Sequence, residues 1–170
     1  MKGLILAGTL FGMLGATALP AAEVARFKAA GPTPALILQG AIVPAGAETF
    51  YLSGQLASPI DPAKPMSATL TIEDFGDTKT QTISVLTKIK GLLAAHGYTL
   101  SDVIKMTVFV AGDPKLGGKM DFAGMNEGYK QFFGTAENPN VVARSTIQVA
   151  ALAAPWALVE IEVTAVRVPK

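Results

Sequence analysis

The sequence contains no cysteine and a single histidine, His96, among its 170 residues. The lack of cysteine excludes disulfides, thiol nucleophiles, thiolate metal sites and a lipid-modified cysteine. A single histidine also excludes a zinc site built from several histidines, and it argues against a histidine-based catalytic triad. Because His96 stands at the end of a predicted helix, we interpret it as a helix-end residue.

An excess of charge of either sign is lacking as well. Lysine and arginine total 14 against 13 aspartate and glutamate residues, which gives a formal net charge of +1. Such a balance creates no overall field that attracts nucleic acid or an anionic membrane, so we expect no nucleic-acid partner. Half of the residues are hydrophobic and 16% are charged. This composition is typical of one folded globular domain.

A complete phosphate-binding motif is also missing. Residues 112–119 are rich in glycine and lysine, but Gly118 stands where a phosphate-binding loop needs its lysine. Lys119 then stands where that loop needs a hydroxyl for Mg²⁺. The sequence has no dinucleotide-binding fingerprint either. We therefore expect a protein that works without a metal or cofactor.

The amino terminus has the pattern of a secretory signal peptide. Lys2 is followed by the largely apolar residues 3–14 and then by a run of small residues. The alternative is a retained membrane anchor, but glycine, alanine, threonine and proline make residues 3–22 weakly hydrophobic. We predict a cleaved leader over residues 1–22, one domain over residues 23–170, and an exported, periplasmic protein without stable membrane insertion. An intact mass that still includes residues 1–14 would contradict cleavage.

The remaining sequence alternates between strand-like and helix-like segments. Residues 23–34 read as an extended lead-in, and the proline-containing residues 57–75 read as a surface loop. Predicted strands lie at residues 35–41, 49–56, 103–110, 142–149 and 158–163, and predicted helices at residues 78–96 and 122–133. The first two strands are expected to pair. Two helices on one face of a mixed sheet make an α+β domain.

The predicted strand at residues 142–149 carries Arg144, the only arginine between Arg26 and Arg167. Strand alternation puts Arg144 on the polar face of its strand and Glu160 on the polar face of the next. If the two strands form an antiparallel hairpin over a shared core, these polar faces meet. Arg144 then either binds a carboxylate with its forked guanidinium or forms an exposed Arg–Glu pair on a wet face.

Several segments together resemble the reactive-intermediate deaminases, the YjgF-like family. They are YLSGQ (51–55), VIKMTVFV (103–110), DFAGMNEGY (121–129), ARS (143–145) and VEIE (159–162). The resemblance implies a chorismate-mutase-like α+β fold, with two helices packed on one face of a mixed β-sheet, assembled as a homotrimer with ligand clefts between subunits. It further implies hydrolysis of enamines and imines derived from amino acids to 2-oxo acids and ammonia, as in a 2-iminobutanoate/2-iminopropanoate deaminase.

The same resemblance assigns site residues. The substrate-binding arginine of the family falls on Arg144, and the acidic residue that handles water falls on Glu160, so these two are the expected catalytic residues. Ser53 and Asn126 match polar residues that line the cleft. Thr146 stands where a cysteine is frequent and keeps a small polar group. With Arg144, these three side chains are the expected substrate-binding residues.

Two departures from the family pattern keep a second function open. Many active members carry a tyrosine two residues before a glutamine, and this sequence has Ile37 before Gln39. Residues 153–156 also look one residue longer than the usual connection. The first difference bears on substrate choice or activity, and the second on the shape of the cleft rim. The alternative function is a non-catalytic binder of small carboxylate metabolites on the same trimeric fold.

Overall fold

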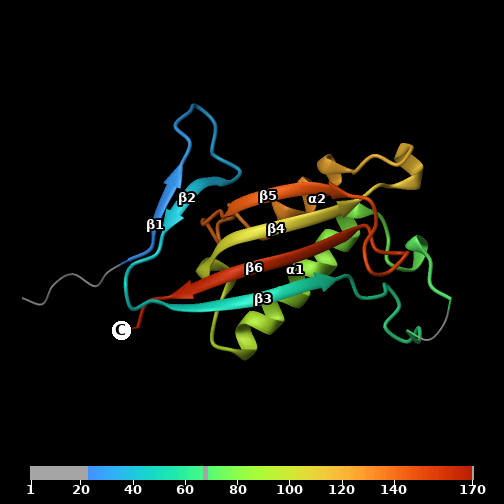
Figure 1. The fold of residues 1–170 in the computed structure, drawn as a ribbon, viewed down its shortest axis with the longest axis horizontal. Coiled ribbons are helices and arrows are strands. Elements are labelled where there is room, and N and C mark those ends of the chain that lie inside the picture. The colour runs from blue at the N-terminus through green and yellow to red at the C-terminus, as the bar shows by residue number, and fades with distance from the viewer. Residues whose placement is uncertain (1–22, 67–68, 170) are drawn as a thin grey trace, which may run out of the picture.

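The computed structural model describes residues 23–66 and 69–169, so the leader predicted over residues 1–22 lies outside the described residues. The described part of the chain folds into strands and helices in the order that Figure 1 labels. The strands are β1 (Ala25–Lys28), β2 (Leu38–Ile42), β3 (Glu48–Leu56), β4 (Val103–Ala111), β5 (Ala143–Val149) and β6 (Val159–Arg167). The α-helices are α1 (Thr78–Ala95) and α2 (Phe122–Tyr129), and short 3-10 helices occur at Ile72–Asp74, Leu100–Asp102 and Pro114–Leu116.

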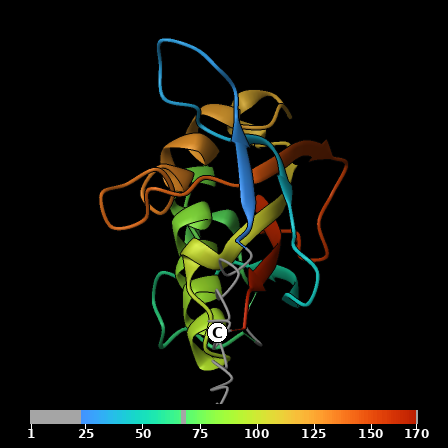
Figure 2. The ribbon, with the colours of Figure 1, turned by 90° about the vertical axis from the view of Figure 1, so that its left-hand side faces the viewer.

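The strands form one mixed sheet that carries both α-helices on a single face (Figure 2). Its order is β1-β2-β5-β4-β6-β3, with β4 parallel to β5 and antiparallel to β6. The β1–β2 pair stands apart from the other four strands (Figure 1), because β2 joins β5 only through the pair Leu38–Ala143. The expected α+β class, with two helices on one face of a mixed sheet, is confirmed.

Two predicted strand pairings are wrong. β5 and β6 do not form a hairpin, because β4 lies between them, and β2 pairs with β1 and β5 instead of β3. β4 takes the centre because its alternate side chains, including Met106 and Val108, are fully buried under the helices. Residues 150–158 are long enough to carry the chain past β4. The predicted lead-in also contains a strand, β1, which pairs with β2.

The main helix begins and ends close to where the sequence predicts. The Asp77 side chain accepts a hydrogen bond of 2.8 Å from the Thr80 backbone N–H, which satisfies one free donor at the start of α1. After α1, Gly97 has φ of 76°, a left-handed conformation that glycine adopts without steric cost. The predicted helix at residues 78–96 is therefore confirmed to within one residue.

The second helix is shorter than predicted, and it packs against α1. α2 ends at Tyr129, and its Gly128 lies against α1, where an added Cβ would come within 2.8 Å of the Thr82 Cβ. Glycine therefore permits close packing between the two helices. Helix α2 lies beside α1 on the same side of the sheet.

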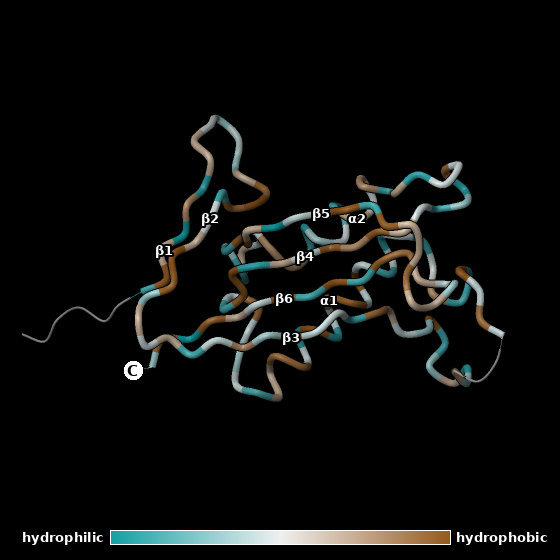
Figure 3. Tube along the Cα trace, in the orientation of Figure 1, coloured by the Kyte–Doolittle hydropathy of each residue, from teal (hydrophilic) through white to brown (hydrophobic). Residues whose placement is uncertain are grey.

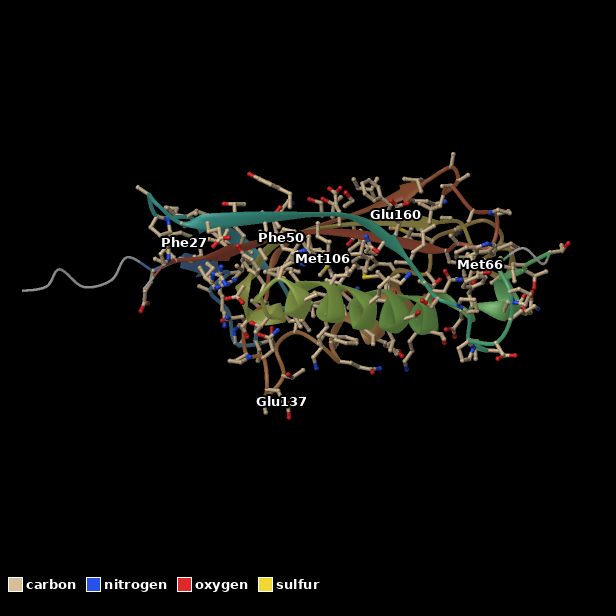
Figure 4. The ribbon with its side chains drawn as sticks, turned by 90° about the horizontal axis from the view of Figure 1, so that it is seen from below. Phe27, Phe50, Met66, Met106, Glu137 and Glu160 are labelled. Carbon is tan, nitrogen blue, oxygen red and sulfur yellow. The ribbon has the colours of Figure 1, made fainter. Side chains whose placement is uncertain are left out.

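The hydrophobic core fills the space between the sheet and the helices. Val85, Leu86 and Ile89 of α1 have no exposed surface, and in Figure 4 Met106 lies between the sheet and α1. Apolar and polar residues alternate along the central strands (Figure 3), so one sheet face is apolar and the other more polar. The helices cover the first face, which we call the helix face. The other is called the open face.

One side chain anchors the exposed strand β1 to the rest of the domain. Arg26 donates hydrogen bonds to the carbonyl oxygens of Val103 at 3.0 Å and Ser101 at 2.8 Å. Burial lowers the pKa of Arg26, and Asp102 opposes that change. Within residues 23–66 and 69–169, none of the helices has the length and apolar composition needed to cross a membrane.

Candidate active site

Arg144 lies on the helix face of β5, directly opposite the buried Met106. Its Nη2 donates a hydrogen bond of 2.6 Å to Oδ1 of Asn126, and its Nη1 lies 3.7 Å from the Met125 sulfur. The guanidinium carbon stands 4.4 Å from the centre of the Tyr129 ring. α2 therefore fixes one edge of the guanidinium, and the group keeps N–H donors for a further acceptor.

The electrostatic setting of Arg144 suits an anionic ligand. Burial lowers the pKa of Arg144, which reflects the partial loss of water around a group that stays charged at neutral pH. Burial also raises the pKa of Tyr129, and the nearby guanidinium opposes that change, so the phenol is neutral. Among the described residues, no carboxylate pairs with Arg144. A charged, partly desolvated arginine without an anion favours binding of a carboxylate.

Thr146 follows two residues later on the same face of β5, opposite Val108. Its Oγ1 is buried and has no hydrogen-bond partner within the described part of the chain. Burying a hydroxyl without a partner costs free energy, so such groups tend to occur where a ligand or water supplies the bond. Thr146 and Arg144 thus share the helix face of β5, and together with Asn126 of α2, which binds Arg144, we call them the Arg144 group.

Glu160 belongs to a second group, on the open face. It lies opposite Phe109 of β4, and its carboxylate rests over Gly54 of β3. An added Cβ at Gly54 would come within 2.0 Å of the Glu160 Oε1. Ser53 precedes Gly54 in an irregular part of β3, between the Leu52 and Gln55 pairs. The close approach of the Glu160 side chain and the irregularity of the strand both occur at Gly54, which has no side chain to obstruct them.

The expectation that Arg144 meets Glu160 within one chain is wrong. The pair Met106–Arg144 puts the arginine on the helix face, whereas the pair Phe109–Glu160 puts the glutamate on the open face. Strand β4 also separates their two strands. The exposed Arg–Glu pair considered from the sequence is therefore not formed in this chain either. The structure brings Asn126 to Arg144 and leaves the Glu160 group on the other side of the sheet.

The surroundings of Arg144 include residues that sequence reasoning missed. Tyr129 and Met125 contact the guanidinium from α2. Spacing was an available signal for Tyr129, because it stands three residues after Asn126 and residues three apart on a helix share a face. Met125 is adjacent to Asn126 in the sequence and lies four residues before Tyr129. Ile37 stands one residue before the Leu38–Ala143 pair that joins β2 to β5, and its side chain is 36% exposed.

The described residues contain no group of three or more histidine, aspartate or glutamate side chains placed to hold a metal ion. The two polar groups can instead act through charge and hydrogen bonding. The Arg144 group can fix a small anion, and Glu160 can exchange a proton with water.

In a comparison with known proteins, residues 39–167 match the model of a protein family described as Endoribonuclease L-PSP. A RutC family protein of Pyrococcus horikoshii is 39% identical over 116 residues, which cover 68% of this chain and 77% of that protein. An Escherichia coli protein named "Putative reactive intermediate deaminase TdcF" is 40% identical over 91 residues, 54% of this chain and 64% of its own length.

Two solved structures are similar to this chain in both fold and sequence. The crystal structure of E. coli TdcF with bound serine has 34% identity and a TM-score of 0.53, and covers 84% of this chain and 93% of TdcF. The E. coli YjgF gene product has 30% identity and the same TM-score of 0.53, with 84% and 94% covered.

Proposed function

Because the chain belongs to the Endoribonuclease L-PSP family, the YjgF/RutC group, we propose that it hydrolyses enamines and imines derived from amino acids. The products are 2-oxo acids and ammonia, as for 2-iminobutanoate and 2-iminopropanoate. The observation that carries this proposal is the partly buried guanidinium of Arg144, which Asn126 orients and no described carboxylate neutralises. The names of the relatives add support, since TdcF is named "Putative reactive intermediate deaminase" and its crystal structure contains bound serine, which carries a carboxylate.

In the proposed reaction, Arg144 binds the carboxylate of the imino acid in a bidentate manner and so fixes the position of the C=N carbon. Glu160 accepts a proton from a water molecule as the water oxygen attacks that carbon. Attack on the protonated imine gives a neutral carbinolamine, and Glu160 returns its proton to the amine nitrogen. The nitrogen leaves as ammonia while the carbinolamine hydroxyl becomes the carbonyl and gives its proton back to the Glu160 carboxylate. The C=N bond is replaced by C=O, and one water is consumed for each ammonia released.

This mechanism needs a second copy of the chain, since Arg144 and Glu160 lie on opposite faces of one sheet. Two further features support self-association. β5 pairs with β2 at only one residue pair, so most of its outer side is unpaired among the described residues. The open face also exposes Tyr51 and Ile147, at 77% and 47%. We propose a homotrimer in which the Arg144 group of one subunit and the Glu160 group of the next form a cleft.

The test is ammonia release from freshly generated 2-iminobutanoate and 2-iminopropanoate. We expect Arg144→Ala to abolish both turnover and carboxylate binding, and Glu160→Gln to keep binding while it lowers turnover by roughly 10²-fold or more. Arg144→Lys keeps the charge but loses the planar fork, so it should also lose most activity. Arg167→Lys is the matched control, because Arg167 pairs with Glu48 at the far end of β6.

Two outcomes would contradict the proposal. If Arg144→Ala and Arg144→Lys both keep the activity and melting temperature of the original protein, Arg144 is an ordinary surface charge. If the unmodified protein binds small carboxylates and releases no ammonia above the uncatalysed rate, the non-catalytic binder is correct. Ile37, at the junction of β2 and β5 where active members carry tyrosine, is the feature that favours this second function.

A further inference from the structure

Gln148 stands near the end of β5, four residues after Arg144 and therefore on the same face of the strand. The residue is exposed, yet both ends of its side-chain amide are engaged. The Oε1 atom accepts a hydrogen bond of 3.1 Å from the Met120 backbone N–H, and Nε2 donates one of 2.8 Å to the Gly118 carbonyl oxygen. The amide of Gln148 thus holds two points of the segment that leads into α2.

The first turn of α2 follows directly and sets the position of Asn126. Asp121 caps the helix, because its Oδ1 accepts a hydrogen bond of 2.8 Å from the Gly124 backbone N–H. The Asn126 Nδ2 donates a bond of 3.0 Å to the Phe122 carbonyl oxygen in that turn. With its N–H side held there, the amide presents Oδ1 to the Arg144 guanidinium at 2.6 Å. The orientation of the guanidinium therefore depends on where the first turn of α2 lies.

The contacts between β5 and α2 occur in opposite order along the chain. Gln148 binds the segment before α2, Arg144 binds Asn126 within the helix, and the Val142 backbone N–H donates a bond of 3.4 Å to the Tyr129 hydroxyl at its end. At about 3.3 Å per strand residue, Gln148 and Arg144 are about 13 Å apart along β5. The eight residues of α2 span about 12 Å. The contacts therefore hold the helix along most of its length.

We propose that Gln148 is a positioning residue for the Arg144 group. A helix forms its backbone hydrogen bonds internally, so side chains such as Gln148 fix its place on a strand. The Gln148 amide keeps the first turn of α2 in place, and Asn126 then holds the guanidinium with its remaining N–H donors free for a carboxylate. This inference deepens the proposed function and rests on it, since it concerns the same carboxylate-binding arginine.

The variant Gln148→Met keeps the length of the side chain and removes both hydrogen bonds. Calorimetric titration with 2-oxobutanoate, a stable carboxylate, should show about tenfold weaker binding, which corresponds to one lost charge-assisted hydrogen bond. The KM for 2-iminobutanoate should rise by a similar factor while kcat falls by less than about threefold, because Glu160 is unchanged. The melting temperature should change little, since the Gln148 side chain is exposed.

A double-mutant cycle tests whether Gln148 acts through Asn126. In the Asn126→Ala protein, the further substitution Gln148→Met should weaken binding of 2-oxobutanoate by less than about twofold. Gln148→Glu keeps an acceptor for the Met120 N–H and loses the donor to Gly118, so its affinity should lie between those of the unmodified protein and Gln148→Met. Gln131→Met is the matched control, because Gln131 is an exposed glutamine just after α2.

Hydrogen exchange in the ligand-free protein gives a readout that does not need binding or turnover. Backbone amides of residues 122–129 should exchange at least about threefold faster in Gln148→Met, whereas those of α1 should not change. Unchanged exchange in α2 would overturn the inference, as would an equal loss of affinity from Gln148→Met with and without Asn126. An unmodified protein that binds no 2-oxobutanoate would instead contradict the proposed function, and hydrogen exchange would still decide whether Gln148 places α2.

Discussion

At the scale of single residues, Gly54 determines where the Glu160 carboxylate can lie. A methyl group at this position would stand 2.0 Å from the Glu160 Oε1, and Gly54 has no positive φ that would itself require glycine. We expect Gly54→Ala to displace the carboxylate and lower ammonia release by about tenfold or more, since an acid/base group contributes roughly 10²-fold or more. Carboxylate binding by Arg144 should be unchanged.

Steady-state kinetics and calorimetry on the same preparation measure the two effects of Gly54→Ala separately. Gly40→Ala is the matched control, because no atom lies within 4 Å of a Cβ added at Gly40. Turnover equal to that of the unmodified protein would mean that the position of Glu160 does not matter to the reaction.

The sequence predicts which residues are candidates for the site, but it does not predict on which side of the sheet each of them lies. Alternation on β6 is clear, and it correctly separates Glu160 from the buried Ile161. On β5 the pattern is misleading, since Ile147 is 47% exposed while Arg144 is partly buried against α2. A long arginine can lie on an apolar face when an amide such as that of Asn126 accepts its hydrogen bond. Hydropathy alone cannot reveal that partner.

At the scale of elements, the sequence patterns that correctly predicted structure were local ones. α1 follows from its Asp77 cap, its apolar spacing and Gly97, all of which lie within the helix or next to it. The strand pairings failed because they depend on competition among distant segments for the centre of the sheet. β4 takes the position between β5 and β6, and the chain after β5 crosses past β4 before β6 begins. No sequence feature within β5 or β6 indicates that crossing.

The cap of α1 gives a prediction about stability and pH. Hydrogen bonding from Thr80 lowers the pKa of Asp77, so the folded-state value lies below the unfolded value of about 3.9. Its contribution is therefore present above about pH 4 and lost as the pH falls through the folded-state pKa. We expect Asp77→Ala to cost about 1 kcal/mol of unfolding free energy at pH 7.

Urea unfolding at pH 7 and near pH 3 measures this effect. The difference between the original protein and Asp77→Ala should shrink at the lower pH. Asp77→Asn is the control, since asparagine also caps helices but carries no titrating group, so its capping should not depend on pH. An equal cost of Asp77→Ala at both pH values would show that the negative charge contributes nothing.

At the scale of the whole molecule, the proposed division of the site between subunits predicts complementation. Arg144→Ala and Glu160→Gln should each be nearly inactive alone. When both chains are co-expressed and assemble at random, each cleft receives an intact Arg144 in half of cases and an intact Glu160 in half of cases. About a quarter of all clefts should therefore be intact. In trimers purified for the presence of both chains, one cleft in three is intact, so about a third of the original activity should return.

Ammonia release by the purified mixed assembly, with the two chains carrying different affinity tags, measures the recovery. The matched control is the co-expression of Arg144→Ala with a double variant that carries both substitutions, which can form no intact cleft. If the mixed assembly is as inactive as this control, Arg144 and Glu160 do not come from neighbouring subunits.

The unpaired outer side of β5 has a consequence for how single chains of the protein behave. This edge presents backbone N–H and C=O groups along the β-prone residues 145–149, and the described residues pair it only at Ala143. A strand edge of this kind accepts any compatible β-segment, including the same edge of another misassembled chain. An interface variant that frees single chains of the proposed trimer should therefore lead to turbidity and fibrillar aggregates instead of a long-lived monomer.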